Sequence, residues 1–348
     1  MKASFLVIFG LVISFLFGQA ETRKPNIVFF FIDDLGWTDL SFMGSKYYES
    51  PHVDKLAKDG MVFMNAYANA PNCAPSRACL MSGKYTPRHG VYTVAGSARG
   101  SAKHRKLIPI KNTTHLAEKF ITMGEALQAG GYVTATMGKW HLGDDPTTQG
   151  FDVNIAGKSW GSPSGGGYHS PYKYPNLEQK EKGEYLTDRL NLEAVDFVER
   201  NKEKPFFLYL SHYAPHTILN GRPDLVDKYR KKHPPGPSDR KNCYLCQDAG
   251  LDADACTHWA PNHNPHLAAM LESIDDGIGL LAKKLDELGL AENTIFIFSS
   301  DNGGETNVTS NAPLRGGKSQ LYEGGIRVPL IVRWPGKTSG GKTSNQPT

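Results

Sequence analysis

The stretch Asn26–Ile32, with the sequence NIVFFFI, is directly followed by Asp33 and Asp34. An apolar run of this length that stops abruptly at charged residues predicts a strand buried on both faces, as strands in parallel sheets are. Four further apolar runs have the same character: Tyr132–Thr136, Phe206–Leu210, Thr294–Ser299 and Val328–Arg333. The sequence therefore predicts a sheet of buried parallel strands.

Stretches with helical spacing of apolar residues lie between these strands, and three of them stop at glycine, which commonly ends a helix. We expect helices at Pro51–Lys58, Met123–Ala129, Tyr185–Asn201 and His266–Leu288. Strands that alternate with helices indicate an α/β fold with a large, mostly parallel or mixed sheet, wrapped by helices on both faces. Two segments without periodicity are predicted to be long surface loops, Gly157–Tyr174 and Arg230–Pro265, and no helix or strand is predicted after Arg333.

The N-terminus has the three parts of a secretory signal peptide. Lys2 supplies a positive charge, Phe5–Phe17 is almost wholly apolar, and Gly18-Gln19-Ala20 offers small residues for cleavage before Glu21. A signal anchor is the alternative, but the apolar run is shorter than the ~20 residues that a membrane-spanning helix needs. No second apolar stretch is long enough to cross a membrane. We predict that residues 1–20 are cleaved and that the protein is extracellular, lysosomal or, in a bacterium, periplasmic.

The overall composition narrows the class of protein further. Of the 348 residues, 39% are hydrophobic and 21% are charged, which is typical of a globular protein. The formal charge of +4 is small, and no basic tract is interleaved with aromatic residues, so we expect no nucleic-acid partner. Sequons at Asn112 and Asn307 offer glycan acceptors if the source is eukaryotic.

Polar side chains follow four of the predicted strands at the point where each strand ends. In chain order they are Asp33 and Asp34, Lys139 and His141, His212 and His216, and Asp301 and Asn302. Open α/β sheets bind their ligands outside the carboxyl ends of their strands. We therefore expect these acids, amides, imidazoles and an amine to gather at one edge of the sheet.

Some of these side chains offer oxygen ligands that suit a hard divalent cation, Ca²⁺ or Mg²⁺. They are Asp33, Asp34, Asp301 and Asn302. Taken alone, the pair Asp33-Asp34 is also explained by a helix N-cap or a solvated loop. The second pair, after another strand, favours a metal site, because three carboxylates held together repel one another unless a cation lies among them.

Basic side chains near the same edge suit a tetrahedral anion and its leaving group. Lys139, His141 and His216 follow predicted strands, and Lys318 lies in the glycine-rich run Arg315-Gly316-Gly317-Lys318, which permits close approach to an anion. His212 is expected to pack at its strand end. We prefer His216 as a functional residue because it lies beyond the strand, in a turn.

The most specific motif is Cys73-Ala74-Pro75-Ser76-Arg77. By composition alone, Cys73 could be structural or one half of a disulfide with Cys79. The motif continues with Ala78-Cys79-Leu80-Met81-Ser82-Gly83 and Arg88-His89-Gly90. Two motifs precede it, Pro25-Asn26-Ile27-Val28 and Asp33-Asp34-Leu35-Gly36. Four motifs follow it: Gly138-Lys139-Trp140-His141-Leu142-Gly143, Ser300-Asp301-Asn302-Gly303, Gly317-Lys318 and Tyr322-Glu323-Gly324-Gly325-Ile326-Arg327-Val328-Pro329. From about Lys24 to Gly336, the chain resembles the sulfatase family.

This resemblance implies an alkaline-phosphatase-like sulfatase fold and the hydrolysis of sulfate esters, of aryl compounds or of glycans. In the family, the motif cysteine is oxidised to formylglycine in the secretory pathway by the formylglycine-generating enzyme, which makes Cys73 the precursor of the nucleophile. One Ca²⁺ per chain is implied, with the ligands Asp33, Asp34, Asp301, Asn302 and the modified Cys73.

The remaining roles are likewise implied by the resemblance. Arg77 orients the formylglycine hydrate, and His141 assists its later breakdown. Lys139 and Lys318 hold the sulfate oxygens, and His216 with Lys318 protonates the leaving alcohol. The resemblance also assigns residues 21–336 to the catalytic domain and 337–348 to a tail. It implies that a C-terminal subdomain is missing, either because the chain is a fragment or because it is naturally short.

Two other functions remain open at this stage. A phosphatase or phosphodiesterase of the same superfamily would share the sheet and the metal-binding aspartates, although that group typically uses Ser or Thr with two zinc ions. A truncated pseudoenzyme that binds sulfated glycans is the other. Conversion of Cys73 would leave four thiols, which permit three full pairings: Cys79, Cys243, Cys246 and Cys256. For Cys243, Cys246 and Cys256 we expect disulfides, with a zinc site that includes His258 and His263 as the alternative.

Overall fold

The computed structural model describes residues 23–232 and 263–348. Several predictions fall on residues outside these ranges: the signal peptide at residues 1–20, the pairing of Cys243, Cys246 and Cys256, and most of the predicted loop Arg230–Pro265. None of the helices in the described ranges is both long enough and apolar enough to cross a membrane.

The described residues form an eight-stranded sheet with the order β4-β3-β5-β1-β6-β7-β2-β8. The strands are β1 (Asn26–Ile32), β2 (Met61–Tyr67), β3 (Val133–Gly138), β4 (Val153–Ile155), β5 (Phe206–Ser211), β6 (Thr294–Ser300), β7 (Arg327–Arg333) and β8 (Lys342–Ser344). β1 lies in the middle and pairs in parallel with β5 and β6. All five predicted strands are present, and the first has the predicted bounds.

The direction of β7 corrects one prediction. This strand was expected to be parallel to the others, but it runs antiparallel to both β6 and β2. A parallel strand needs a crossover that returns the chain to the opposite edge of the sheet. Here the chain stays at the edge where β6 ends, since the backbone N–H of Gly303 donates to Gly325 O at 3.0 Å. β7 therefore starts at that edge and runs back.

Three strands were not predicted. β8 contradicts the expectation that no strand follows Arg333: it pairs in parallel with β2 at the rim of the sheet. Its residues, Lys-Thr-Ser, are polar and mostly exposed, so they carry no apolar pattern. β4 has only three residues, and β2 alternates irregularly between buried and half-buried positions.

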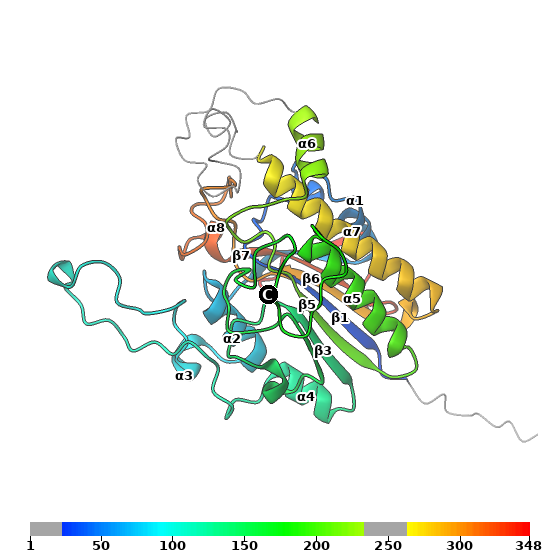
Figure 1. Cartoon of the computed structure of the whole chain (residues 1–348), viewed down its shortest axis with the longest axis horizontal. Helices are drawn as coiled ribbons and strands as arrows, with labels where there is room; N and C mark the ends of the chain where they lie inside the picture. The colour runs from blue at the N-terminus through cyan, green and yellow to red at the C-terminus, as the bar shows by residue number, and fades with distance from the viewer. Residues whose placement is uncertain (1–22, 233–262) are drawn as a thin grey trace, which may run out of the picture.

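Helices cover both faces of the sheet, as predicted (Figure 1). One face carries α1 (Pro51–Asp59), α5 (Leu186–Arg200), α6 (Pro223–Lys232) and α7 (Pro265–Glu287), and the other carries α2 (Cys73–Ser82), α3 (Thr86–His89) and α4 (Met123–Ala129). The short helix α8 (Glu323–Ile326) precedes β7, and single 3₁₀ turns lie at Ser41–Met43, Ala102–His104, Pro146–Gln149 and Ala291–Asn293. The four predicted helices are all present, with bounds shifted by at most one residue.

Successive side chains of β1 point to opposite faces and so enter two separate cores. Val28, Phe30 and Ile32 pack in the core beneath α1, α5 and α7. Phe29 and Phe31 pack in the core that contains Ala74 and Ala78 of α2. This double burial explains why the run NIVFFFI is continuously apolar.

The segment 157–174 contains no helix and no strand longer than a single bridge, as predicted. α7 begins with a typical N-cap. The side chain of Asn264 accepts hydrogen bonds from the backbone N–H groups of His266 and Leu267, and Pro265 is the first helical residue. α6, which was not predicted, includes the first three residues of the predicted loop Arg230–Pro265.

Candidate active site

Four parallel neighbours, β3, β5, β1 and β6, end at the same edge of the sheet and bring the predicted side chains together. The backbone pairing continues just past the strand ends: Lys139 N donates to Ser211 O, His212 N to Phe31 O, and Asp301 N to Ile32 O. The side chains that follow these strands are therefore held by the sheet itself, and not by flexible loops.

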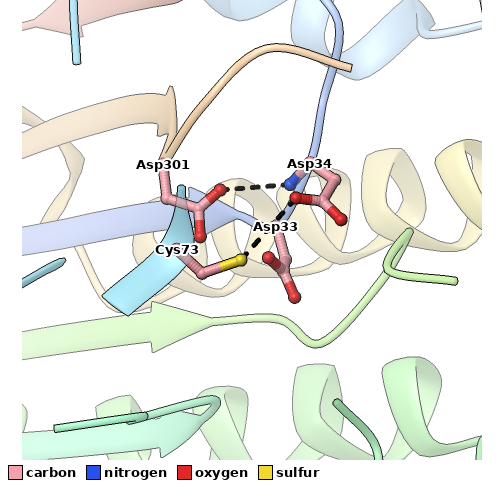
Figure 2. A group of neighbouring side chains, drawn as sticks. All are labelled: Asp33, Asp34, Cys73 and Asp301. Carbon is pink, nitrogen blue, oxygen red and sulfur yellow. Dashed lines mark hydrogen bonds between the residues drawn. The ribbon is translucent and has the colours of Figure 1, made fainter. Parts of the chain in front are cut away.

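Cys73 is the first residue of α2 and is almost completely buried. Its Sγ lies 3.8 Å from Asp34 Oδ1 and points into the group of carboxylates (Figure 2). Burial raises the pKa of the Cys73 thiol, and the nearby Asp34 and Asp301 add to the rise, although Lys139 and Lys318 oppose it. Cys73 and Cys79 are both free, so the alternative of a disulfide between them is wrong.

Asp33, Asp34, Cys73 and Asp301 form a compact buried group, hereafter the carboxylate cluster (Figure 2). Each offers one ligand atom, and these atoms all lie within 4.8 Å of one another. The backbone N–H of Asp34 donates to Asp301 Oδ1 at 3.1 Å, and Asn302 Nδ2 donates to Asp34 Oδ1 at 2.8 Å. Asn302 thus lies at the cluster, as predicted.

Two oxygen atoms at this cluster test whether a metal ion fits. Asp33 Oδ1 and Asn302 Oδ1 are buried and accept no hydrogen bond from the described residues. A buried acceptor without a donor is costly, and a cation removes that cost. Both atoms are hard oxygen ligands for a metal ion, so the buried acidic cluster could hold a divalent cation such as Ca²⁺.

Each carboxylate of the cluster also has its own cationic partner. Lys139 Nζ lies 2.6 Å from Asp33 Oδ2, and Lys318 Nζ lies 2.5 Å from Asp34 Oδ2. Burial raises the pKa of Asp33 despite Lys139. Burial also acts to raise the pKa of Asp34, but Lys318 and other nearby basic groups outweigh it and hold that pKa below its usual value.

Arg77, on the second turn of α2, is the partner of Asp301. Its Nε donates to Asp301 Oδ2 at 2.8 Å, and its Nη1 donates to Lys139 O and to Ser211 Oγ. The side chain is 1% exposed. Arg77 therefore ties α2, and with it Cys73, to the ends of β3, β5 and β6.

We expect Arg77→Met to lower the free energy of unfolding by about 3–5 kcal/mol, because it leaves the carboxylate of Asp301 buried without its partner. Urea denaturation followed by circular dichroism measures this loss. Arg88→Met, at an exposed arginine of α3, is the control and should cost no more than about 0.5 kcal/mol. Equal losses in the two variants would show that the buried ion pair does not hold α2 in place.

Three histidines differ in their surroundings. His141 has a φ of 63°, and its backbone N–H donates to Lys158 O at 2.9 Å. Its Nδ1 is buried and has no hydrogen-bond partner among the described residues. Burial, together with Lys139 and Arg77, lowers the pKa of His141 to about 2, which leaves it neutral. His212 is fully buried with its ring 5.1 Å from that of Phe30, as expected of a packing residue.

His216 approaches the cluster from the turn after β5. Its Nδ1 lies 2.6 Å from Thr217 O, which fixes a proton on Nδ1, and its Nε2 lies 3.8 Å from Asp34 Oδ2. Burial lowers the pKa of His216. All the predicted site residues therefore lie at or beside the carboxylate cluster, apart from His212, which was expected to be structural.

Sequence reasoning missed two serines that support the site. Ser211 Oγ accepts from Arg77, and Ser300 Oγ accepts from the backbone N–H of Leu35 at 3.1 Å. Each is a polar residue that ends an otherwise apolar strand. That position could have identified them, since a buried polar group at a strand end needs a partner.

Comparison with known proteins places this architecture in a family. A model of the family described as "Sulfatase" matches residues 25–348. A sulfatase from Formosa agariphila is 34% identical over 96% of this chain and 68% of its own length, and N-acetylgalactosamine-6-sulfatase from Mus musculus is 31% identical over 95% and 61%. The chain thus spans about three fifths of the mouse relative.

A solved structure agrees with these relatives. The crystal structure of Ps i-CgsB in complex with k-i-k-neocarrahexaose is 32% identical, with a TM-score of 0.71, and the match covers 94% of this chain and 69% of that one. The match includes most of both chains, and the residues matched by the family model include all the strand-end residues described above. The chain belongs to the sulfatase family.

Proposed function

We propose that this protein hydrolyses sulfate esters to an alcohol and inorganic sulfate. The observation that carries the proposal is the buried carboxylate cluster, in which Cys73 lies among three aspartates. Each of the three aspartates forms an ion pair with a lysine or an arginine. Such a site concentrates positive groups and a metal-binding cluster around one small residue, which suits the transfer of a tetrahedral anion. Membership of the sulfatase family supports the same reaction.

We propose further that Cys73 is converted to formylglycine by the formylglycine-generating enzyme. A buried thiol among carboxylates is a weak nucleophile, since they disfavour the thiolate. The hydrate of the aldehyde at residue 73 has two hydroxyl groups in place of the thiol. One loses its proton and attacks sulfur while the bond from sulfur to the alcohol oxygen breaks and that oxygen takes up a proton. The other then loses its proton to re-form the aldehyde as sulfate leaves.

The ligands of the proposed Ca²⁺ are Asp33, Asp34, Asp301, Asn302 and the modified residue 73. When bound, the cation supplies positive charge next to the attacking hydroxyl and the sulfate oxygens. Asp33 and Asn302 are the best supported ligands, because each keeps a buried oxygen without a hydrogen bond.

The basic residues have separate proposed tasks. Arg77 orients residue 73, and its hydrogen bond to Asp301 from the second turn of α2, the helix that residue 73 begins, supports this. Lys139 and Lys318 neutralise the sulfate oxygens. Neutral His141 accepts a proton from the hydrate during sulfate release. His216 acts in its imidazolium form, in which Nε2 also carries a proton, and gives that proton to the leaving alcohol with Lys318 beside it.

For the substrate, we propose a sulfated sugar. The mouse relative is named for N-acetylgalactosamine 6-sulfate, and the solved structure contains a carrahexaose. Aryl sulfates then serve as convenient assay substrates. We also propose that the chain is secreted, with residues 1–20 as its signal peptide and residues 21–336 as the catalytic domain.

Of the two sequons, Asn307 is the better glycan acceptor. Asn112 Nδ2 already donates to Thr93 O and Ala95 O, and a glycan on this nitrogen would remove one of these bonds. Asn307 is exposed and bonds only locally, to Glu305. A glycan on Asn307 would therefore leave the fold intact.

Parallel assays on 4-nitrophenyl sulfate and 4-nitrophenyl phosphate test the proposed reaction. We expect the sulfate to be turned over faster by about 10-fold or more, since the chain belongs to the sulfatase family. Mass spectrometry of the tryptic peptide Asp59–Arg77 should show an aldehyde in place of the thiol. Preference for the phosphate would favour a phosphatase, and binding of sulfated glycans without turnover would favour a pseudoenzyme. An intact thiol in the active protein would refute the formylglycine mechanism.

A further inference from the structure

The irregular segment 157–174 touches both histidines of the site. Near its start, Lys158 O accepts from the backbone N–H of His141. Further along, the hydroxyl of Tyr168 lies 2.7 Å from His216 O. We propose that Tyr168 is a positioning residue, which holds His216 where it can protonate the leaving alcohol. This inference rests on the proposed sulfatase function.

The contact of Tyr168 is with a turn and not with the imidazole itself. The residues from Tyr213 to His216 form a tight turn, closed by the hydrogen bond from His216 N to Tyr213 O at 2.9 Å. The Tyr168 hydroxyl lies 2.9 Å from Tyr213 O and 2.7 Å from His216 O. It therefore bridges the first and last carbonyls of the turn and shares one proton between them.

The ring of His216 has little freedom once its backbone is fixed. Its Nδ1 is bound 2.6 Å from the carbonyl oxygen of the next residue, Thr217, which leaves Nε2 as the atom that faces the cluster. The Tyr168 hydroxyl binds the carbonyl between these two residues. A shift of that peptide group therefore moves Nε2 directly, and a loss of ~1 Å in placement is costly for catalysis.

Tyr168 is suited to this task because it is 2% exposed, and burial holds the pKa of its phenol well above the usual value. The phenol therefore keeps its proton at neutral pH and remains a hydrogen-bond donor. A second tyrosine ties the same turn from the other side, since Tyr213 OH donates to Ala156 O at 3.0 Å. The His216 turn is thus anchored by two residues that follow β4, Ala156 and Tyr168.

Tyr168→Phe removes the hydroxyl and keeps the ring, and Tyr174→Phe is the matched control. Tyr174 lies in the same segment and is also buried, and its hydroxyl donates to Gly167 O at 3.0 Å and not to a carbonyl of the turn. Its ring packs against that of Tyr213, and Tyr174→Phe keeps this contact. Turnover is measured on aryl sulfates whose phenols range from acidic, as in 4-nitrophenyl sulfate, to weakly acidic, as in phenyl sulfate. A weakly acidic phenol needs the proton from His216, and 4-nitrophenol does not.

For Tyr168→Phe we expect kcat to fall about 10-fold on phenyl sulfate and by no more than about twofold on 4-nitrophenyl sulfate. The two losses differ because a positioned general acid matters only where the leaving group needs a proton. Tyr174→Phe should change both rates equally. In a His216→Ala background, adding Tyr168→Phe should cause no further loss on phenyl sulfate. If Tyr168→Phe does not fold, Tyr213→Phe, which loosens the same turn, replaces it and should show the same dependence on the leaving group.

Other outcomes overturn the inference. Equal losses on all the aryl sulfates, or a further loss in the His216→Ala background, would mean that Tyr168 has a structural role alone. If the wild-type protein hydrolyses no sulfate ester, the proposed function fails first and the inference fails with it. If the wild-type protein is active but Tyr168→Phe behaves like the Tyr174→Phe control, the proposed function is kept and the positioning role of Tyr168 is rejected.

Discussion

Replacing Cys73 with alanine should abolish the turnover of sulfate esters, and replacing it with serine should stop the reaction after one attack. Alanine has no group that can attack sulfur, so we expect kcat to fall by about 10⁴-fold or more, as when a covalent nucleophile is removed. Serine offers one hydroxyl, which can take the sulfate group from the substrate. It lacks the second hydroxyl that would expel sulfate, and a sulfate ester on residue 73 should accumulate.

Steady-state assays measure the first effect, and the intact mass of Cys73→Ser after incubation with substrate measures the second. Cys79→Ala is the matched control: Cys79 is also free, buried and on α2, but its Sγ contacts His89 Nε2 at 3.4 Å instead of the carboxylate cluster. We expect this variant to keep its activity and to lose about 1 kcal/mol of stability. Substantial activity in Cys73→Ala would mean that another group attacks sulfur.

The parts of the fold that sequence reasoning predicted are those in which burial leaves a direct trace. β1 has its predicted bounds because both of its faces are covered, which makes NIVFFFI continuously apolar. Its neighbours were predicted for the same reason. Once these strands were predicted, the rule that parallel strands end at a common edge was enough to predict that Asp33, Lys139 and Asp301 lie close together.

The parts that were missed depend on contacts between distant residues. The direction of β7 is set by the pairing of Gly303 with Gly325 across a long connection, which an apolar run cannot reveal. α2 was missed because nine of its ten residues are buried, including Arg77, so it has no polar face and no helical period. The order of the motifs implied the roles of Lys139 and Lys318, but only the structure gives each its aspartate partner.

Removal of a bound divalent cation should inactivate the protein and lower its melting temperature, and Ca²⁺ should restore both. Within the described part of the chain, two buried oxygens of the cluster, on Asp33 and Asn302, accept no hydrogen bond, and a cation would satisfy both. At a Ca²⁺ concentration 100-fold above its Kd, the bound state gains about 2.7 kcal/mol. For a chain of this size we expect a rise in melting temperature of about 4 °C.

Asp33→Asn separates this effect from simple loss of stability, because it keeps the shape of the side chain and removes its charge. We expect the variant to lose the thermal shift with Ca²⁺. Asp39→Asn is the matched control, since Asp39 is an equally buried carboxyl soon after β1 that accepts from Gly36 N and Thr309 Oγ1, outside the cluster. It should melt at a lower temperature and still respond to Ca²⁺. A shift that survives in Asp33→Asn would place the cation elsewhere.

The charge balance of the site adds a second arm to this experiment. Asp33, Asp34 and Asp301 are already matched by Lys139, Lys318 and Arg77, so a divalent cation leaves the buried site with two excess positive charges. An anion such as sulfate offsets that excess, and each ligand should therefore strengthen the binding of the other. We expect Ca²⁺ and sulfate together to raise the melting temperature by more than the sum of their separate shifts. Strictly additive shifts would mean that the anion binds away from the carboxylate cluster.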